Sequence, residues 1–271
     1  MNASAILLLS FAVAQLEAGP VQPPVDDPPV IETSNGAPPG YDPDFALQAA
    51  IEWTLLHELG HALVAEFDLP IAGSEESAVD GFASSRLAER HNDFEAADRL
   101  AATAQLWFQK AERNSGPDIL GDHESDGRRA FRIACIAEEV SPDTGAELAA
   151  WAGFDADLYE TCGDANLVIQ AEAWDLLLAD AFLSGGEPQS KVAVTYLVGG
   201  GETRERLVES GLVERIATEA ARTYRWSGTL EFVGRECGVP EAYFDPDEWR
   251  IVLCYELVAD LYDLARDDTE D

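Results

Sequence analysis

Basic residues are scarce in this chain of 271 residues. It has 17 lysines and arginines against 52 aspartates and glutamates, and its only lysines are Lys110 and Lys191. The resulting net charge of −35 would repel phosphate groups, which excludes nucleic acid and anionic membranes as main partners. We interpret the acidic excess as a solvated surface suited to high salt.

Long hydrophobic runs are also missing. An apolar run from Ala5 to Ala14 is too short to span a bilayer, and Ala12-Val13-Ala14 offers an A-x-A cleavage site. Residues 1–18 therefore resemble a secretory signal peptide, although a buried N-terminal helix is the alternative because no Lys or Arg precedes the run. No later stretch is long enough for a transmembrane helix. We expect a secreted or periplasmic protein without stable membrane insertion.

The chain has four cysteines and no C-x-x-C spacing, which argues against a cysteine-ligated zinc site. Four cysteines fit two disulfides in an oxidising compartment, with three possible pairings. We favour Cys135 with Cys162 and Cys237 with Cys254, because each pair closes a local loop. The alternative is four buried free thiols in a cytosolic protein.

Helical patterns dominate the folded part of the chain. Residues 19–44 are rich in Pro, Gly and Asp and read as a disordered linker, residues 45–266 as a single domain, and residues 267–271 as an acidic tail. The expected helices cover about 45–67, 75–90, 94–113, 126–139, 144–152, 165–183, 203–224 and 254–265.

Strand signals are confined to the C-terminal quarter. Residues 229–233 and 249–253 are rich in β-branched and aromatic residues and flank a Pro-Asp turn. The sequence therefore predicts an α+β fold that is predominantly α-helical, with a small C-terminal β-sheet.

The most informative segment is His57-Glu58-Leu59-Gly60-His61. Two histidines four residues apart lie one turn above each other on one face of a helix and can reach the same cation. The chain has only four histidines, so a chance match is improbable. Zinc held in this way lowers the pKa of a bound water, and the intervening Glu58 can take the proton.

The surroundings of the motif favour a metal site over a solvated helix face. Apolar residues at helical spacing should partly enclose the histidines, and buried imidazoles need partners: Trp53, Leu56, Leu59, Leu63, Val64. Gly60 costs the helix about 1 kcal/mol relative to Ala, which is reasonable if another backbone or a substrate approaches closely there.

A catalytic zinc needs three protein ligands, and Glu76 is our candidate for the third. Asp80 follows four residues later and could accept the free N–H of a histidine ligand. Glu75 is the rival ligand but has no acidic partner four residues on, and acids at a helix N-terminus are also favoured by the helix dipole. The pattern Glu-x-x-x-Asp after HExxH resembles the gluzincins, the zincin clan that includes thermolysin-like peptidases.

A peptidase also needs a group that stabilises the oxyanion. His123, in Gly121-Asp122-His123-Glu124, is the first candidate, and Tyr255 is another side chain that could face the zinc. Arg129 lies on the helix that follows His123. The alternative interpretation is that His123 is an ordinary loop residue and that Arg129 forms a surface ion pair. His91 reads more simply as a surface or helix C-terminal residue.

Three blocks of the sequence resemble a family of bacterial metallopeptidases that is known mainly from sequence as a domain of unknown function. They are His57 to Asp80, Asp122 to Cys135 and Cys237 to Leu257. In that family the last block precedes the zinc helix, whereas here it comes last, as in a circular permutation or a second copy that lost its other half. Residues 242–253 resemble the edge strand that binds extended substrate in zincins.

Our leading hypothesis is a secreted zinc metallopeptidase with a zincin-like domain. His57, His61 and Glu76 would bind Zn²⁺, Glu58 would act as general base and acid, and a peptide or protein would be the substrate. The alternatives are a non-catalytic zincin-like protein in which zinc is structural, and a zinc-independent helical domain with an accidental motif. An intact Glu58 argues against a purely structural metal.

Overall fold

The computed structural model describes residues 40–114, 125–153, 162, 167–185 and 190–267. Within these residues the protein is predominantly helical with one four-stranded sheet, so the predicted α+β class is confirmed. None of the helices in these ranges combines the length and the apolar character that crossing a bilayer requires. The predicted signal peptide, most of the predicted linker, His123 and residues 268–271 lie outside the described residues.

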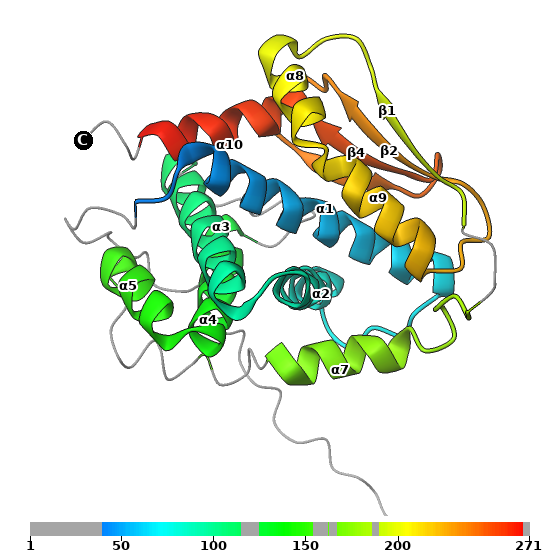
Figure 1. Ribbon diagram of the computed structural model, residues 1–271, viewed down its shortest axis with the longest axis horizontal. Helices are drawn as coiled ribbons and strands as arrows, with labels where there is room; N and C mark the ends of the chain where they lie inside the picture. Colours follow the sequence, from blue (N-terminus) through cyan, green and yellow to red (C-terminus); the bar gives the residue numbers. More distant parts are fainter. Residues whose placement is uncertain (1–39, 115–124, 154–161, 163–166, 186–189, 268–271) are drawn as a thin grey trace, which may run out of the picture.

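One buried helix, α1 (Pro43–Phe67), runs through the middle of the molecule (Figure 1). It begins two residues before the predicted start, because the Asp42 side chain accepts hydrogen bonds from the Asp44 and Phe45 amides and Pro43 occupies the first turn. It ends at Asp68, which adopts a left-handed conformation, two residues before Pro70. Most of its side chains are buried, which makes α1 the core of the fold.

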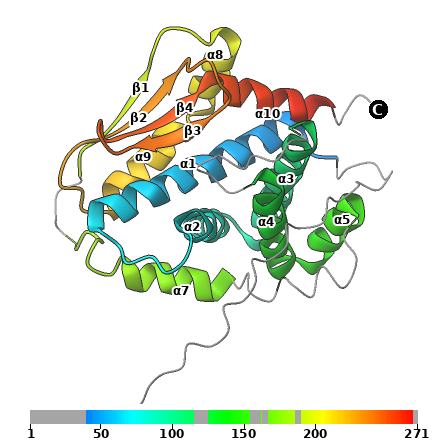
Figure 2. The same ribbon diagram turned by 180° about the vertical axis from the view of Figure 1, so that it is seen from behind.

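A group of helices covers α1 on the side away from the sheet (Figures 1 and 2). Side-chain caps begin several of them: Ser74 accepts from the Ser77 amide, Asn92 from the Glu95 amide and Ser141 from the Thr144 amide. The helices are α2 (Glu75–Arg90), α3 (Asp93–Arg113), α4 (Asp126–Val140), α5 (Pro142–Ala152) and α7 (Leu167–Leu177). Of these, α2 and α3 pack directly on α1.

The sheet lies on the other side of α1, in the strand order β1-β2-β4-β3. Strands β1 (Val192–Tyr196), β2 (Leu230–Arg235) and β4 (Arg250–Cys254) are parallel, and the edge strand β3 (Ala242–Asp245) is antiparallel to β4. Helices α8 (Gly201–Ser210) and α9 (Leu212–Thr223) connect β1 to β2, and α10 (Tyr255–Asp267) follows β4. Because β3 and β4 contact α1, the C-terminal sheet borders the helix that carries the motif.

The structure corrects three predictions. Strand β1 lies before the C-terminal quarter, and its Val192, Val194 and Tyr196 alternation had been missed. The helix predicted over 203–224 is two helices, because Gly211 takes a left-handed φ of 58° that ends α8 and begins α9. The helix predicted over 165–183 ends at Leu177, and residues 178–181 form a turn that leads to a β-bridge between Phe182 and Tyr224.

Both predicted cysteine pairs lie at disulfide distance. The Sγ atoms of Cys135 and Cys162 are 2.06 Å apart and those of Cys237 and Cys254 are 2.03 Å apart. Cys135 lies on α4, whereas the second pair ties the segment between β2 and β3 to the end of β4, immediately before α10. Each bond therefore fastens a local segment on one side of α1.

We predict that Gly60→Ala destabilises the protein. A Cβ atom at Gly60 would lie 3.0 Å from the Cβ of Val79 on α2 and 3.2 Å from Cδ1 of Phe82, and both neighbours are fully buried. Overpacking should cost more than the ~1 kcal/mol that Ala gains in helix propensity, for a net loss of about 1 kcal/mol in urea unfolding.

Gly127→Ala on α4 is the matched control. Its Cβ would meet only Ala111 at 3.8 Å, an ordinary contact, so this variant should be as stable as the wild type or slightly more so. Equal gains from both substitutions would show that α2 does not press on Gly60.

Candidate metal centre

Two helices bring the motif residues and Glu76 together. His57, Glu58 and His61 lie on consecutive turns of α1, and the Ser74 cap starts α2 so that Glu75 and Glu76 fall in its first turn. The chain between the two helices turns at Asp68 and Gly73, both with positive φ. This short connection presents the N-terminus of α2 to the two imidazoles.

The possible ligand atoms are close together. The two histidine Nε2 atoms are 3.2 Å apart. Glu76 Oε1 lies 3.1 Å from Nε2 of His61, and Glu76 Oε2 lies 3.4 Å from Nε2 of His57. His57, His61 and Glu76 thus form a group that could hold a metal ion.

These spacings match the size of a small tetrahedral cation. Bonds of about 2.0–2.1 Å to tetrahedral ligands place neighbouring ligand atoms about 3.3 Å apart. The observed separations of 3.1 to 3.4 Å bracket that value. The three side chains are therefore close enough together to share one metal ion.

Each imidazole has a carboxylate at its second nitrogen. Asp80 Oδ1 lies 2.9 Å from Nδ1 of His57, and Glu75 Oε1 lies 2.7 Å from Nδ1 of His61. An acceptor at Nδ1 fixes the tautomer in which Nε2 carries the lone pair, as a metal ligand requires. Asp80 thus lies beside one histidine of the motif and Glu75 beside the other, a contact that the sequence analysis did not predict.

Arg129 of α4 reaches the same carboxylates. Its Nε lies 3.2 Å from Oδ1 of Asp80 and its Nη2 lies 3.3 Å from Oε2 of Glu76. Only 5% of Arg129 is exposed, so the reading of this residue as a surface ion pair was wrong. Burial would raise the pKa of Asp80, but the charge of Arg129 and the hydrogen bond from His57 together lower it.

The site carries an excess of negative charge. With the carboxylates ionised, four acidic groups face two guanidinium groups and leave two negative charges: Glu58, Glu75, Glu76, Asp80, Arg129, Arg132. Burial lowers the pKa of His61, but hydrogen bonds to Glu76 and Glu75 and the charge of Glu58 raise it to about 9. The same field that favours a proton on His61 would favour a divalent cation.

Glu58 is the least compensated acid of the group. It is 2% exposed, and its Oε2 atom has no hydrogen-bond partner among the described residues. An unpartnered buried carboxylate oxygen is costly, and a water molecule or a proton would satisfy it. This environment suits a group that takes up and releases a proton.

Other sequence candidates lie elsewhere. His123 is outside the described residues. The Tyr255 hydroxyl is 2.9 Å from the carbonyl oxygens of both Leu197 and Gly234, so it hydrogen-bonds to the backbone at the ends of β1 and β2. His91 caps the C-terminus of α2, as expected, and bridges Glu52 and Glu95.

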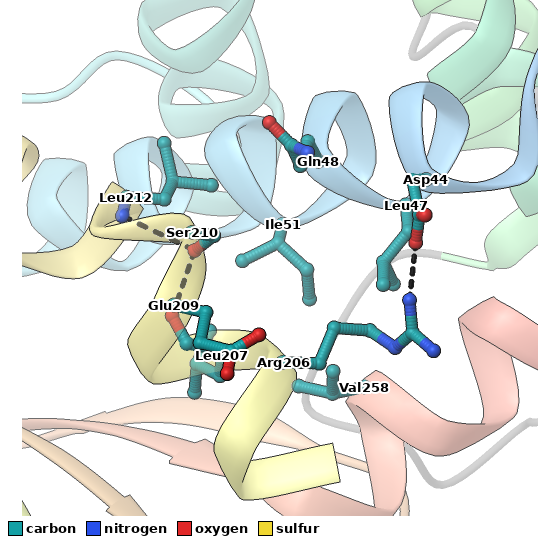
Figure 3. Close-up of a pocket in the computed structure, with 10 residues that line it drawn as sticks. All are labelled: Asp44, Leu47, Gln48, Ile51, Arg206, Leu207, Glu209, Ser210, Leu212 and Val258. Atoms are coloured by element: carbon teal, nitrogen blue, oxygen red, sulfur yellow. Dashed lines mark hydrogen bonds and ion pairs between the residues drawn. The ribbon is translucent and has the colours of Figure 1, made fainter. Parts of the chain in front are cut away.

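A cavity of about 260 Å³ lies between the first turns of α1 and helices α8 and α10 (Figure 3). Within it, Arg206 contacts Asp44 and the Ser210 hydroxyl accepts a hydrogen bond from the Leu212 amide. None of the motif residues lines it. The ligand geometry, not this cavity, identifies the candidate site.

We predict that Glu76→Ala weakens divalent metal binding more than Glu75→Ala does. One Glu76 oxygen lies near Nε2 of His61 and the other lies near Nε2 of His57, whereas Glu75 contacts only Nδ1 of His61. Loss of the orienting acid should cost about 10–100-fold in affinity, and loss of the ligand should cost more. Competition with a chromogenic chelator measures both constants, and the reverse order would exchange the two roles.

Comparison with known sequences relates the chain to one family. A sequence family described as "Putative metallopeptidase" matches residues 39–178 and 200–271, which include the candidate site and the Cys237 to Leu257 block. No curated protein matches the chain. No solved structure matches it either. We predicted that in other members of this family the Cys237 to Leu257 block precedes the motif helix, and this stays a prediction. Because the match covers most of the chain, the protein belongs to this metallopeptidase family.

Proposed function

We propose that this protein is a zinc-dependent peptidase whose metal is held by His57, His61 and Glu76. The observation that carries the proposal is the spacing of 3.1 to 3.4 Å among the two Nε2 atoms and the Glu76 oxygens. Membership of a metallopeptidase family supports a metal-dependent hydrolase.

The donor set favours zinc over other common cations. Two imidazole nitrogens and one carboxylate oxygen are typical ligands of catalytic zinc. Calcium and magnesium prefer six or more oxygen ligands and would leave both imidazoles without a role. Bound zinc would supply a water of lowered pKa and polarise the carbonyl of the scissile bond.

Glu58 is the proposed general base and acid. It follows His57 on α1, and its Oε2 atom is buried without a hydrogen-bond partner within the described part of the chain. The carboxylate would take a proton from the attacking water and hold it in an enclosed position. It would then deliver this proton to the leaving amine of the substrate.

Strand β3 is the proposed docking edge for an extended peptide. It is an edge strand of the sheet and contacts α1, the helix that carries the motif. A substrate strand could add to it through main-chain hydrogen bonds. We propose a peptide or protein substrate and not nucleic acid, because the net charge of −35 would repel phosphates.

The same proposal includes export from the cytoplasm. Two disulfide pairs are typical of proteins that fold in oxidising compartments. The apolar run near the N-terminus is compatible with a signal peptide.

We predict that expression of the full chain in a bacterium with a periplasm gives exported protein that lacks about the first 14–18 residues. Intact-mass analysis measures the cleavage and the state of the cysteines. A mass that shows Met1 retained and four free thiols would contradict export.

We predict that Glu58→Gln keeps the fold and one zinc per chain but loses hydrolysis. The amide has nearly the shape of the carboxylate but cannot accept a proton, so kcat on a peptide library or casein should fall by about 10²–10⁴-fold. Zinc content by mass spectrometry and circular dichroism check metal and fold.

Glu66→Gln is the matched control for this variant. Glu66 also lies on α1, where it accepts a hydrogen bond from the Ser227 amide near the C-terminal end of the helix. Its substitution should leave turnover unchanged. Equal turnover by the wild type and Glu58→Gln would refute the role of Glu58 as general base.

A further inference from the structure

Arg129 joins two acids that have different tasks at the metal centre. Its Nη2 donates to Oε2 of Glu76, the candidate third ligand, and its Nε donates to Oδ1 of Asp80. The same Asp80 oxygen lies 2.9 Å from Nδ1 of His57. One guanidinium therefore contacts one ligand directly and another through its orienting acid.

The position of Arg129 is fixed by aromatic rings. Its guanidinium carbon lies 5.6 Å from the ring centre of Trp53 on α1 and 5.1 Å from that of Trp107 on α3. Trp53 in turn stacks on the His57 ring at 5.3 Å and donates a hydrogen bond to Ser84, whose hydroxyl donates to the Asp80 carbonyl. The contacts with rings and acids come from α1, α2 and α3, which leaves the side chain few alternative rotamers.

The guanidinium also distinguishes the two oxygens of Glu76. Oε2 receives the Arg129 hydrogen bond and lies 3.4 Å from Nε2 of His57, whereas Oε1 lies 3.1 Å from Nε2 of His61. A carboxylate held by one oxygen presents the other in a defined direction. The hydrogen bond from Arg129 therefore restrains the rotation of the Glu76 carboxylate, which faces both imidazoles.

We propose that Arg129 is a positioning residue for the metal: it orients Glu76 directly and His57 through Asp80, and so sets the affinity and geometry of the centre. The proposal rests on the metal site of the proposed function but does not depend on peptide hydrolysis. It requires the planar fork of arginine, since the ammonium group of lysine cannot donate along two fixed directions and stack on two rings.

A second buried cluster on α1 provides a control with similar chemistry. Glu52, which is 3% exposed, pairs with Arg90 at 2.7 Å and with Arg99 at 3.2 Å. Arg99 also lies over the ring of Phe45, at 5.1 Å from its centre. Arg99 thus resembles Arg129 in its acid and aromatic contacts, but it contacts none of the proposed ligands through any of these bonds.

The experiment compares Arg129→Lys with Arg99→Lys in the full chain freed of metal by a chelator. Binding of Co²⁺ followed by its visible absorption, and of Zn²⁺ by competition, gives affinity and coordination geometry without reference to activity. Arg129→Lys should weaken both metals by about 10–100-fold and change the Co²⁺ spectrum, as expected for loss of an outer partner. Arg99→Lys should keep wild-type affinity and spectrum even if its melting temperature falls.

A second comparison covers the case in which Arg129→Lys fails to fold. It sets the single variant Asp80→Asn against the double variant Asp80→Asn, Arg129→Met. Removing the Asp80 charge avoids leaving an unpaired buried acid beside the new methionine. Addition of Arg129→Met should then weaken Zn²⁺ binding further, by about tenfold, through the loss of its hold on Glu76. No further loss, or wild-type binding by Arg129→Lys, or equal losses in Arg99→Lys, would overturn the proposal.

The outcome can be separated from that of the proposed function. A wild-type protein that binds metal tightly but cleaves no peptide, together with a weakened Arg129→Lys, would support the positioning role and refute the peptidase. Hydrolysis that survives in Arg129→Lys with unchanged metal affinity would do the reverse. Absence of metal binding by the wild type would refute both.

Discussion

The buried carboxylate of Asp80 is the constraint on which the arrangement of the helices depends. It is 2% exposed and lies among His57 of α1 and Arg129 and Arg132 of α4, while α2 carries it. A charge so far from water is tolerable only when its partners are in place, so the three helices must pack in one register. That register also brings Glu76 to the two imidazoles. The same helix packing therefore satisfies the Asp80 carboxylate and assembles the candidate metal site.

A comparison of the acids on α1 indicates which of them serves function. Glu52 and Glu58 are equally buried, at 3% and 2% exposure. Glu52 contacts two arginines and a histidine, which offset the cost of its burial and tie α1 to α2 and α3. Glu58 has an oxygen without such a partner in the part of the chain that the structure describes. A buried acid that the fold does not compensate is more simply explained by chemistry than by stability.

Local rules predicted the parts of the site that depend on local geometry. Helical periodicity places His57 and His61 on one face, and the Ser74 cap fixes the first turn of α2, where Glu76 lies four residues before Asp80. The rest depends on contacts between distant segments. Arg129 meets Asp80 only because α4 packs beside α2, and β1 is a strand because β2, 38 residues later in register, pairs with it. Gly211 shows another limit of prediction from sequence. A glycine in a helical pattern can be tolerated or can end the helix, and here its positive φ ends helix α8.

The position of the C-terminal sheet shows that chain order constrains this site weakly. Strand β3 follows α1 by about 180 residues and still lies against it. The block from Cys237 to Cys254 is closed by its own disulfide and by antiparallel pairing of β3 with β4. Its contact with α1 depends on side-chain packing, and the cost of closing a connecting loop rises only slowly with loop length. Such a block can border the motif helix whether it precedes or follows that helix, because the candidate metal ligands all come from the separate pair α1 and α2.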